Sequence, residues 1–122
     1  MNSPSKRLLS WLPAIVWAGT IFYFSTQTTI KHPHPWLFAH DKWVHGTIFF
    51  MLSSCVYFGF RKGEQLPPLR AALFALILSS LYGVSDEIHQ IFTPTRSSDP
   101  MDWVADTVGS SLVLFFALIK RI

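Results

Sequence analysis

Four apolar runs, each long enough to cross a lipid bilayer, restrict the fold of this chain more than any other feature. They occupy residues 8–26, 43–60, 71–92 and 101–119. Half of the 122 residues are hydrophobic and only 14% are charged, which leaves too little polar surface for a small soluble domain. The sequence therefore predicts a single all-α domain, a four-helix transmembrane bundle.

Basic residues in the connections predict the orientation, because cytoplasmic loops of membrane proteins retain Lys and Arg. Seven of the ten basic residues fall on one side of the predicted bundle, and three fall on the other. The first group is Lys6, Arg7, Arg61, Lys62, Arg70, Lys120 and Arg121, and the second is Lys31, Lys42 and Arg96. We therefore expect a multi-pass protein with both termini in the cytoplasm.

Polar residues near the outer ends of three runs are expected to lie below the membrane surface. Each run has only thirteen to fifteen residues between its inner basic residue and its outer polar residue, which is about 20 to 23 Å of helix. The hydrocarbon layer is about 30 Å thick, and charged groups within it usually face a protein interior or a water-filled cavity. The residues concerned are His45, Asp86, His89, Asp102 and Asp106. They predict a polar pocket in the outer leaflet.

Helical spacing gives the third run an inward-facing polar stripe. The stripe consists of Ser79, Tyr82, Asp86, His89 and Gln90. Glu87 follows about 100° further round the same helix, beside Gly83. The polar residues of SDEIHQ at 85–90 are therefore expected to form one wall of the pocket.

Two classes of function are disfavoured by composition. The net charge is +3, but the basic residues are scattered in ones and twos and form no patch suited to nucleic acid. Cys55 is the only cysteine, so neither a disulfide framework nor a CxxC metal site is expected.

Three segments together resemble the VanZ-like family of small bacterial membrane proteins. They are HDKWVH at 40–45, SDEIHQIFTPTRSSDPMDWVAD at 85–106 and the TVGS that follows. The resemblance covers roughly residues 10–120 and implies a protein of the bacterial cytoplasmic membrane. For the founding member it implies a link to low-level resistance toward the glycopeptide teicoplanin, and it implies no established reaction.

The resemblance also implies a set of functional residues. Position by position they are Asp41, Lys42, His45, Asp86, Glu87, Gln90, Arg96, Asp102 and Gly109. Two positions depart from the family pattern, because Asp106 stands where Asn is common and Thr95 stands where a Gly often precedes the Arg. The first departure adds an acid to a predicted pocket that is already rich in acids.

The first hypothesis for the function is a binding module for an envelope lipid. Lys42 and Arg96 would hold a phosphate or pyrophosphate, and carboxylates would orient these two cations or reach sugar hydroxyls. The expected partner is a membrane lipid, including a lipid-linked cell-wall precursor, or a lipoglycopeptide. The ligand-binding candidates are Lys42, Arg96, Gln90, Asp41, Asp102 and Asp106.

The second hypothesis is a membrane-embedded enzyme that acts on a lipid-linked phosphate or glycolipid. Its catalytic residues would be Asp86, Glu87 and His45, working as acid and base or through a bound metal. The metal-ligand candidates are His45, Asp86 and His89.

Two further interpretations remain open at this point. Intramembrane acids and histidines can relay protons in a small transporter, although the inner halves of the last three runs carry no comparable polar stripe. The same polar groups can also serve only to tie helices together, for example through Asp86 or Asp102 with Lys42 or Arg96. For Asp99 and Asp102, capping of a helix start is a local explanation.

Overall fold

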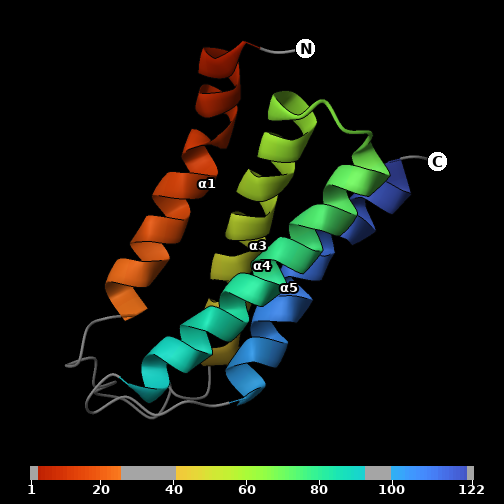
Figure 1. Ribbon diagram of the computed structural model, residues 1–122. Coiled ribbons are helices and arrows are strands. Elements are labelled where there is room, and N and C mark those ends of the chain that lie inside the picture. Colours follow the sequence, from red (N-terminus) through yellow and green to blue (C-terminus); the bar gives the residue numbers. More distant parts are fainter. Residues whose placement is uncertain (1–2, 26–40, 93–99, 121–122) are drawn as a thin grey trace.

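The computed structural model of the protein describes residues 3–25, 41–92 and 100–120, and these residues form four α-helices and no strand. The helices are α1 (Pro4–Ser25), α3 (Asp41–Phe58), α4 (Pro68–Ile91) and α5 (Pro100–Lys120) (Figure 1). A short π-helix, η1 (Gly59–Gly63), continues α3. The all-α prediction is confirmed, and each helix corresponds to one of the four apolar runs.

The helices alternate in direction, so the two ends of the bundle differ in what they contain. One end of the bundle holds the start of α1, the π-helix η1 and the end of α5 (Figure 1). The other end holds the last turns of α1 and α4 and the first turns of α3 and α5. We call this second end the acidic end, because it carries Asp86, Glu87, Asp102 and Asp106. The beginning of α1 and the end of α5 therefore lie at the same end of the bundle.

Three described helical segments are long and apolar enough to cross a membrane. They are Trp43–Gly63, Pro68–Ile91 and Pro100–Lys120. Their outward faces expose large apolar side chains, a pattern that suits contact with lipid rather than with water. A membrane protein is thus supported, while the spanning of the bilayer by residues 8–26 and the cytoplasmic side of the termini stay predictions.

Small residues bring α3 and α5 into close contact. A Cβ atom built on Gly109 would lie 2.0 Å from the backbone oxygen of Gly46, so only glycine fits at position 109. Further along the contact, Ser53 Oγ donates a hydrogen bond of 3.0 Å to the carbonyl of Ser110. Such close backbone approach through Gly and Ser is a common way for membrane helices to associate. It fixes the relative position of the two helices that carry His45 and Asp106.

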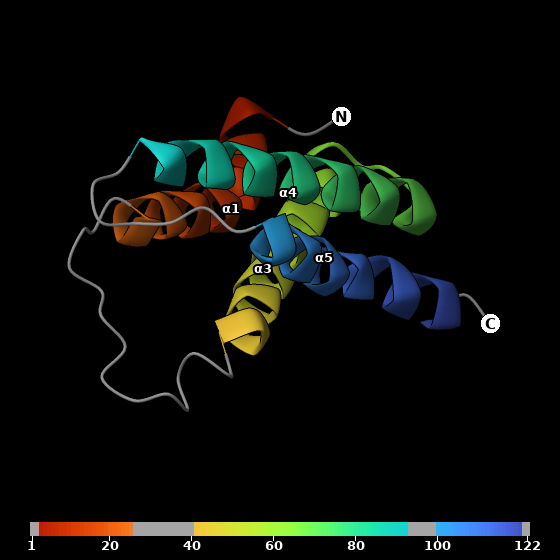
Figure 2. The ribbon, with the colours of Figure 1, turned by 90° about the horizontal axis from the view of Figure 1, so that it is seen from below.

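The first helix packs on α3 and η1, whereas α5 lies against both α3 and α4 (Figure 2). Trp11 of α1 covers the two glycines of η1, since a Cβ atom on Gly59 would lie 2.6 Å from its ring. Trp17 Nε1 donates to the carbonyl of Ile48 over 3.0 Å. Arg7 and Glu64 form an ion pair with an Nε to Oε2 distance of 3.0 Å. These contacts attach α1 along the side of α3.

The turn between α3 and α4 is built by local backbone chemistry. The amide of Glu64 donates to the carbonyl of Gly59, which closes the wide turn of the π-helix. Gln65 then adopts a left-handed conformation with φ of 58°, which stops the helix. Pro68 opens α4, where a proline is tolerated because its missing N–H has no helical partner.

Candidate acidic site

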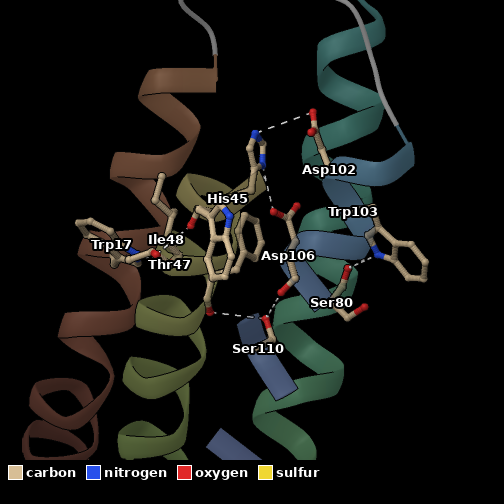
Figure 3. A network of polar contacts seen from close by, with 11 residues as sticks. Trp17, His45, Thr47, Ile48, Ser80, Asp102, Trp103, Asp106 and Ser110 are labelled. Atoms are coloured by element: carbon tan, nitrogen blue, oxygen red, sulfur yellow. Dashed lines mark hydrogen bonds and ion pairs between the residues drawn. The ribbon is translucent and has the colours of Figure 1, made fainter. Parts of the chain in front are cut away.

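Asp106 of α5 stands at the centre of the polar contacts at the acidic end. Its side chain has no solvent-exposed surface, and its Oδ1 lies 3.0 Å from Nδ1 of His45 on α3. When Asp106 is ionised, its Oδ1 can only accept, and the Nδ1–H of His45 then donates this bond. The other ring nitrogen, Nε2, lies 3.8 Å from Oδ2 of Asp102, so the imidazole stands between two acids of α5 (Figure 3).

Helix α4 brings two further carboxylates to Asp106. Asp86 and Glu87 are each 8% exposed, and one oxygen from each lies within 4.8 Å of the others and of an Asp106 oxygen. Gln90, one turn further along α4, is also buried. The arrangement places three acids from two helices around one point, which we call the carboxylate triad: Asp86, Glu87 and Asp106.

A glycine allows α4 to approach Asp106. A Cβ atom on Gly83 would lie 3.2 Å from Oδ2 of Asp106 and 3.3 Å from the Trp103 ring. Beside it, Trp103 Nε1 donates to the carbonyl of Ser80 over 3.1 Å (Figure 3). Ser80 Oγ also lies 3.0 Å from the Thr107 hydroxyl. The α4 and α5 helices are therefore held together immediately next to the carboxylate triad.

The backbone around Asp106 is also fixed by hydrogen bonds. Ser110 Oγ donates to the carbonyl of Asp106 over 2.8 Å, from one turn further along the same helix. The glycine contact between α3 and α5 lies next to the His45 and Asp106 pair along both helices, because Gly46 directly follows His45 and Gly109 comes three residues after Asp106. His45 and Asp106 consequently meet because two backbones are packed closely, not because two long side chains reach across a gap.

Two hollows lie between α1 and α4, and they adjoin one another. A pocket of about 370 Å³ is lined by Phe22, Tyr82, Ser85, Asp86, Ile88, His89 and Phe92. An apolar groove of about 420 Å³ is lined by Trp11, Ala14, Ile15, Ala18, Leu52, Val56, Leu78, Ser79, Leu81, Tyr82 and Ser85. Tyr82 and Ser85 line both, so the groove leads to the edge of the carboxylate triad at Asp86.

A family model described as VanZ/LLP1 matches residues 10–121. The chain belongs to the VanZ/LLP1 family. No curated protein and no solved structure matches it. The predicted VanZ-like membership is confirmed.

Several of the VanZ-like positions come together in space. His45, Asp102 and Gly109 join α3 to α5, and Asp86 and Glu87 face Asp106 from α4. Gln90 is buried on the same face of α4. The side chains of Asp41 and Lys42, and all of Thr95, Arg96 and Asp99, lie outside the described residues. The predicted pairing of acids with Lys42 or Arg96 therefore stays a prediction.

The buried face of α4 differs from the predicted stripe in two residues. The buried members at this end are Ser79, Gly83, Asp86, Glu87 and Gln90. Tyr82 and His89 are half-buried on the side toward α1, where the His89 ring lies 5.0 Å from the Phe22 ring between centroids. The Tyr82 hydroxyl donates to the carbonyl of Ala18 over 2.6 Å. These two residues therefore line the hollows rather than the contact with α5.

Gly46, Ser53 and Ser110 position the site, and their contacts were not predicted from the sequence. Gly46 directly follows His45, and Ser110 lies four residues after Asp106. A small residue next to a polar residue, or one turn away from it, can indicate a helix contact. This pattern does not identify which helix the small residue packs against. Asp106 stands where the VanZ-like pattern commonly has Asn. In the structure this residue of α5 lies against both α3 and α4.

Proposed function

We propose that this VanZ/LLP1 protein binds an envelope lipid, with the lipid chain in the groove between α1 and α4 and the headgroup at the acidic site. One observation carries the proposal: the apolar groove and the pocket beside Asp86 share Tyr82 and Ser85 as lining residues. An amphiphile needs an apolar surface that continues into polar groups, and this combination supports such a ligand.

The lining residues support the assignment of each half of the ligand. The groove presents almost only apolar atoms and lies among helices that face lipid, so an acyl or polyprenyl chain suits it better than a soluble metabolite. At the other end, the Ser85 hydroxyl, the Asp86 carboxylate and the His89 ring line the pocket, and polar groups of these kinds suit the hydroxyl groups of a sugar or an ammonium group. A phosphate or pyrophosphate would be met by Lys42 and Arg96.

The proposed ligand class includes lipid-linked cell-wall precursors. The glycopeptide teicoplanin acts on such precursors, so binding at this site would alter susceptibility to that drug. We therefore expect cells that express the protein to differ in teicoplanin susceptibility from cells that express Asp86→Asn, and we expect the difference to follow lipid binding. Equal susceptibility despite lost lipid binding would separate the drug effect from the site.

Native mass spectrometry of protein released from detergent tests the binding directly. Ser85 is exposed and lines both hollows, so Ser85→Trp blocks their junction without entering the helix contacts. Val104→Trp is the matched control, because Val104 is exposed on α5 and lines neither hollow. We expect a retained lipid mass in the wild type and in Val104→Trp, and its loss in Ser85→Trp and in Asp86→Asn.

Lipid mass retained equally by all four proteins would contradict the proposal, because the binding would then be unspecific. Bare wild-type protein would contradict it as well. The mass of a retained species would also distinguish a phospholipid from a lipid-linked sugar. A second readout, photocrosslinking of a lipid probe with a diazirine in its chain, should label residues of α1 and α4 around the groove.

Catalysis on the same lipid is a second candidate function. The contact between His45 and Asp106, with Asp86 and Glu87 close by, offers groups able to take up or donate protons. Incubation of purified protein with a lipid-linked phosphate, followed by chromatography of the lipid products, tests this candidate. Product formed by the wild type and not by Glu87→Gln would support an enzyme, whereas unchanged substrate in both would leave a binding protein.

A further inference from the structure

We infer that the carboxylate triad, Asp86, Glu87 and Asp106, binds one divalent metal ion between α4 and α5. One oxygen from each residue lies within 4.8 Å of the other two. All three side chains are buried, with exposures of 8%, 8% and 0%. The site goes beyond the proposed lipid binding and does not require it, since two of its three members lie outside the lining of the pocket.

The size of the triad fits an ion bound by oxygen. Oxygens on opposite sides of an ion lie roughly 4 Å apart for Mg²⁺ and roughly 5 Å apart for Ca²⁺, given their usual bond lengths. The spacing of at most 4.8 Å between the triad oxygens falls in this range. Three carboxylates in a buried position repel one another strongly, and a divalent cation would convert this repulsion into attraction.

The second, independent observation is the state of the Asp106 side chain. Its Oδ2 is fully buried and accepts no hydrogen bond from the part of the chain that the structure describes. It points toward α4, where a Cβ atom on Gly83 would lie 3.2 Å away. Buried carboxylate oxygens are normally satisfied, so this oxygen indicates a ligand that is not a described side chain.

His45 holds Asp106 in the required orientation. Its Nδ1 lies 3.0 Å from Oδ1 of Asp106, which leaves Oδ2 directed toward the triad. Carboxylates that bind metals are usually fixed by such an outer hydrogen bond. His45 is therefore a positioning residue. His89 is not a member of the triad, and its ring lies beside Phe22. With oxygen donors alone, the triad should prefer Mg²⁺, Mn²⁺ or Ca²⁺ to softer ions.

A cationic side chain is the competing occupant of the same position. Lys42 or Arg96 could neutralise the triad from outside the described residues, and a divalent ion would then be excluded. The two occupants differ in a measurable way, because only an empty triad takes up an added ion. Direct measurement of ion binding therefore decides between them.

Titration with Mn²⁺ followed by electron paramagnetic resonance is the experiment. The full-length protein is purified in detergent, stripped with a chelator and freed of it before Mn²⁺ is added. We expect the wild type to bind one Mn²⁺, with Asp86→Asn, Glu87→Gln and Asp106→Asn each weakened by at least roughly tenfold. Glu64→Gln is the matched control, because Glu64 lies at the opposite end and pairs with Arg7. Added Mg²⁺ or Ca²⁺ should displace the bound Mn²⁺.

Wild-type protein that binds no more Mn²⁺ than Asp86→Asn would overturn the inference and favour an internal Lys or Arg. Equal binding by all variants would overturn it too. If Asp106→Asn fails to give a helical, monodisperse protein, Asp86→Asn decides, since Asp86 borders a pocket. Lipid retention by the same samples is measured separately, so failure of the metal site and failure of lipid binding give different results.

Discussion

Replacement of Gly109 by alanine tests whether close backbone packing builds the acidic site. The added Cβ atom would lie 2.0, 2.7 and 2.9 Å from the oxygen, carbonyl carbon and Cα of Gly46. All three neighbours are backbone atoms, so no side-chain rotation can relieve the clash. Ordinary contacts begin at 3.4 Å, and 3.4 less 2.0 gives a required separation of about 1.4 Å.

Such a separation would also break the contact between His45 and Asp106. Their distance of 3.0 Å would lengthen well beyond hydrogen-bond range if α3 and α5 moved apart by this amount. Overpacking costs about 1–3 kcal/mol, and loss of a hydrogen bond to a charged group costs about 1.5–3 kcal/mol. The higher helix propensity of alanine relative to glycine offsets about 1 kcal/mol of this loss. The expected net loss in the free energy of unfolding is about 1.5–5 kcal/mol.

Unfolding in mixed micelles of increasing SDS content, followed by circular dichroism, measures this loss. Gly19→Ala is the matched control, because a Cβ atom at Gly19 meets nothing within 4 Å. That variant should be as stable as the wild type or more stable by up to about 1 kcal/mol. Gly109→Ala with the stability of Gly19→Ala would refute the argument that α3 and α5 meet backbone to backbone.

Three other contacts give predictions for the same unfolding assay. The hydrogen bond from Arg7 lowers the pKa of Glu64 below its ordinary value of 4.5. The ion pair therefore adds stability above pH 4.5 that is lost as the pH falls through the lowered pKa, and Glu64→Gln should lack this part of the loss between pH 7 and 3. Tyr82→Phe removes a hydrogen bond to α1 and should cost about 1 kcal/mol, whereas an unchanged midpoint would exclude that bond. Gly59→Ala should destabilise the wild type but not a Trp11→Ala background, because its Cβ atom meets the Trp11 ring at 2.6 Å; equal losses in both backgrounds would contradict this.

The helices could be predicted from the sequence because they depend on run length, and the level of the polar residues in the bilayer stays a prediction from the same run lengths. Apolar runs of bilayer length form helices in any arrangement, and a polar residue that comes too early in a run lies below the surface whatever its neighbours. The meeting of Asp86, Glu87 and Asp106 follows from this reasoning. Their meeting also needs α4 and α5 to be adjacent, antiparallel and rotated so that these side chains face one another.

The rotation of each helix about its own axis could not be predicted in the same way. Spacing alone grouped Tyr82 and His89 with Asp86, whereas the face of α4 against α5 includes Ser80, Gly83 and Glu87. The difference arises because α5 packs where α4 has small residues, which depends on the partner and not on polarity. The pairing of Gly46 with Gly109 likewise requires two surfaces to be known at once.

The antiparallel order of the helices has a consequence for synthesis of the protein. His45, Asp86 and Asp106 lie on three successive helices, and α5 follows the other two in the chain. While the ribosome is still making α5, the acids of α4 have entered the membrane without the partner that encloses them. Insertion of α4 must therefore tolerate these acids until α5 arrives, either beside water at the acidic end or within the translocation machinery.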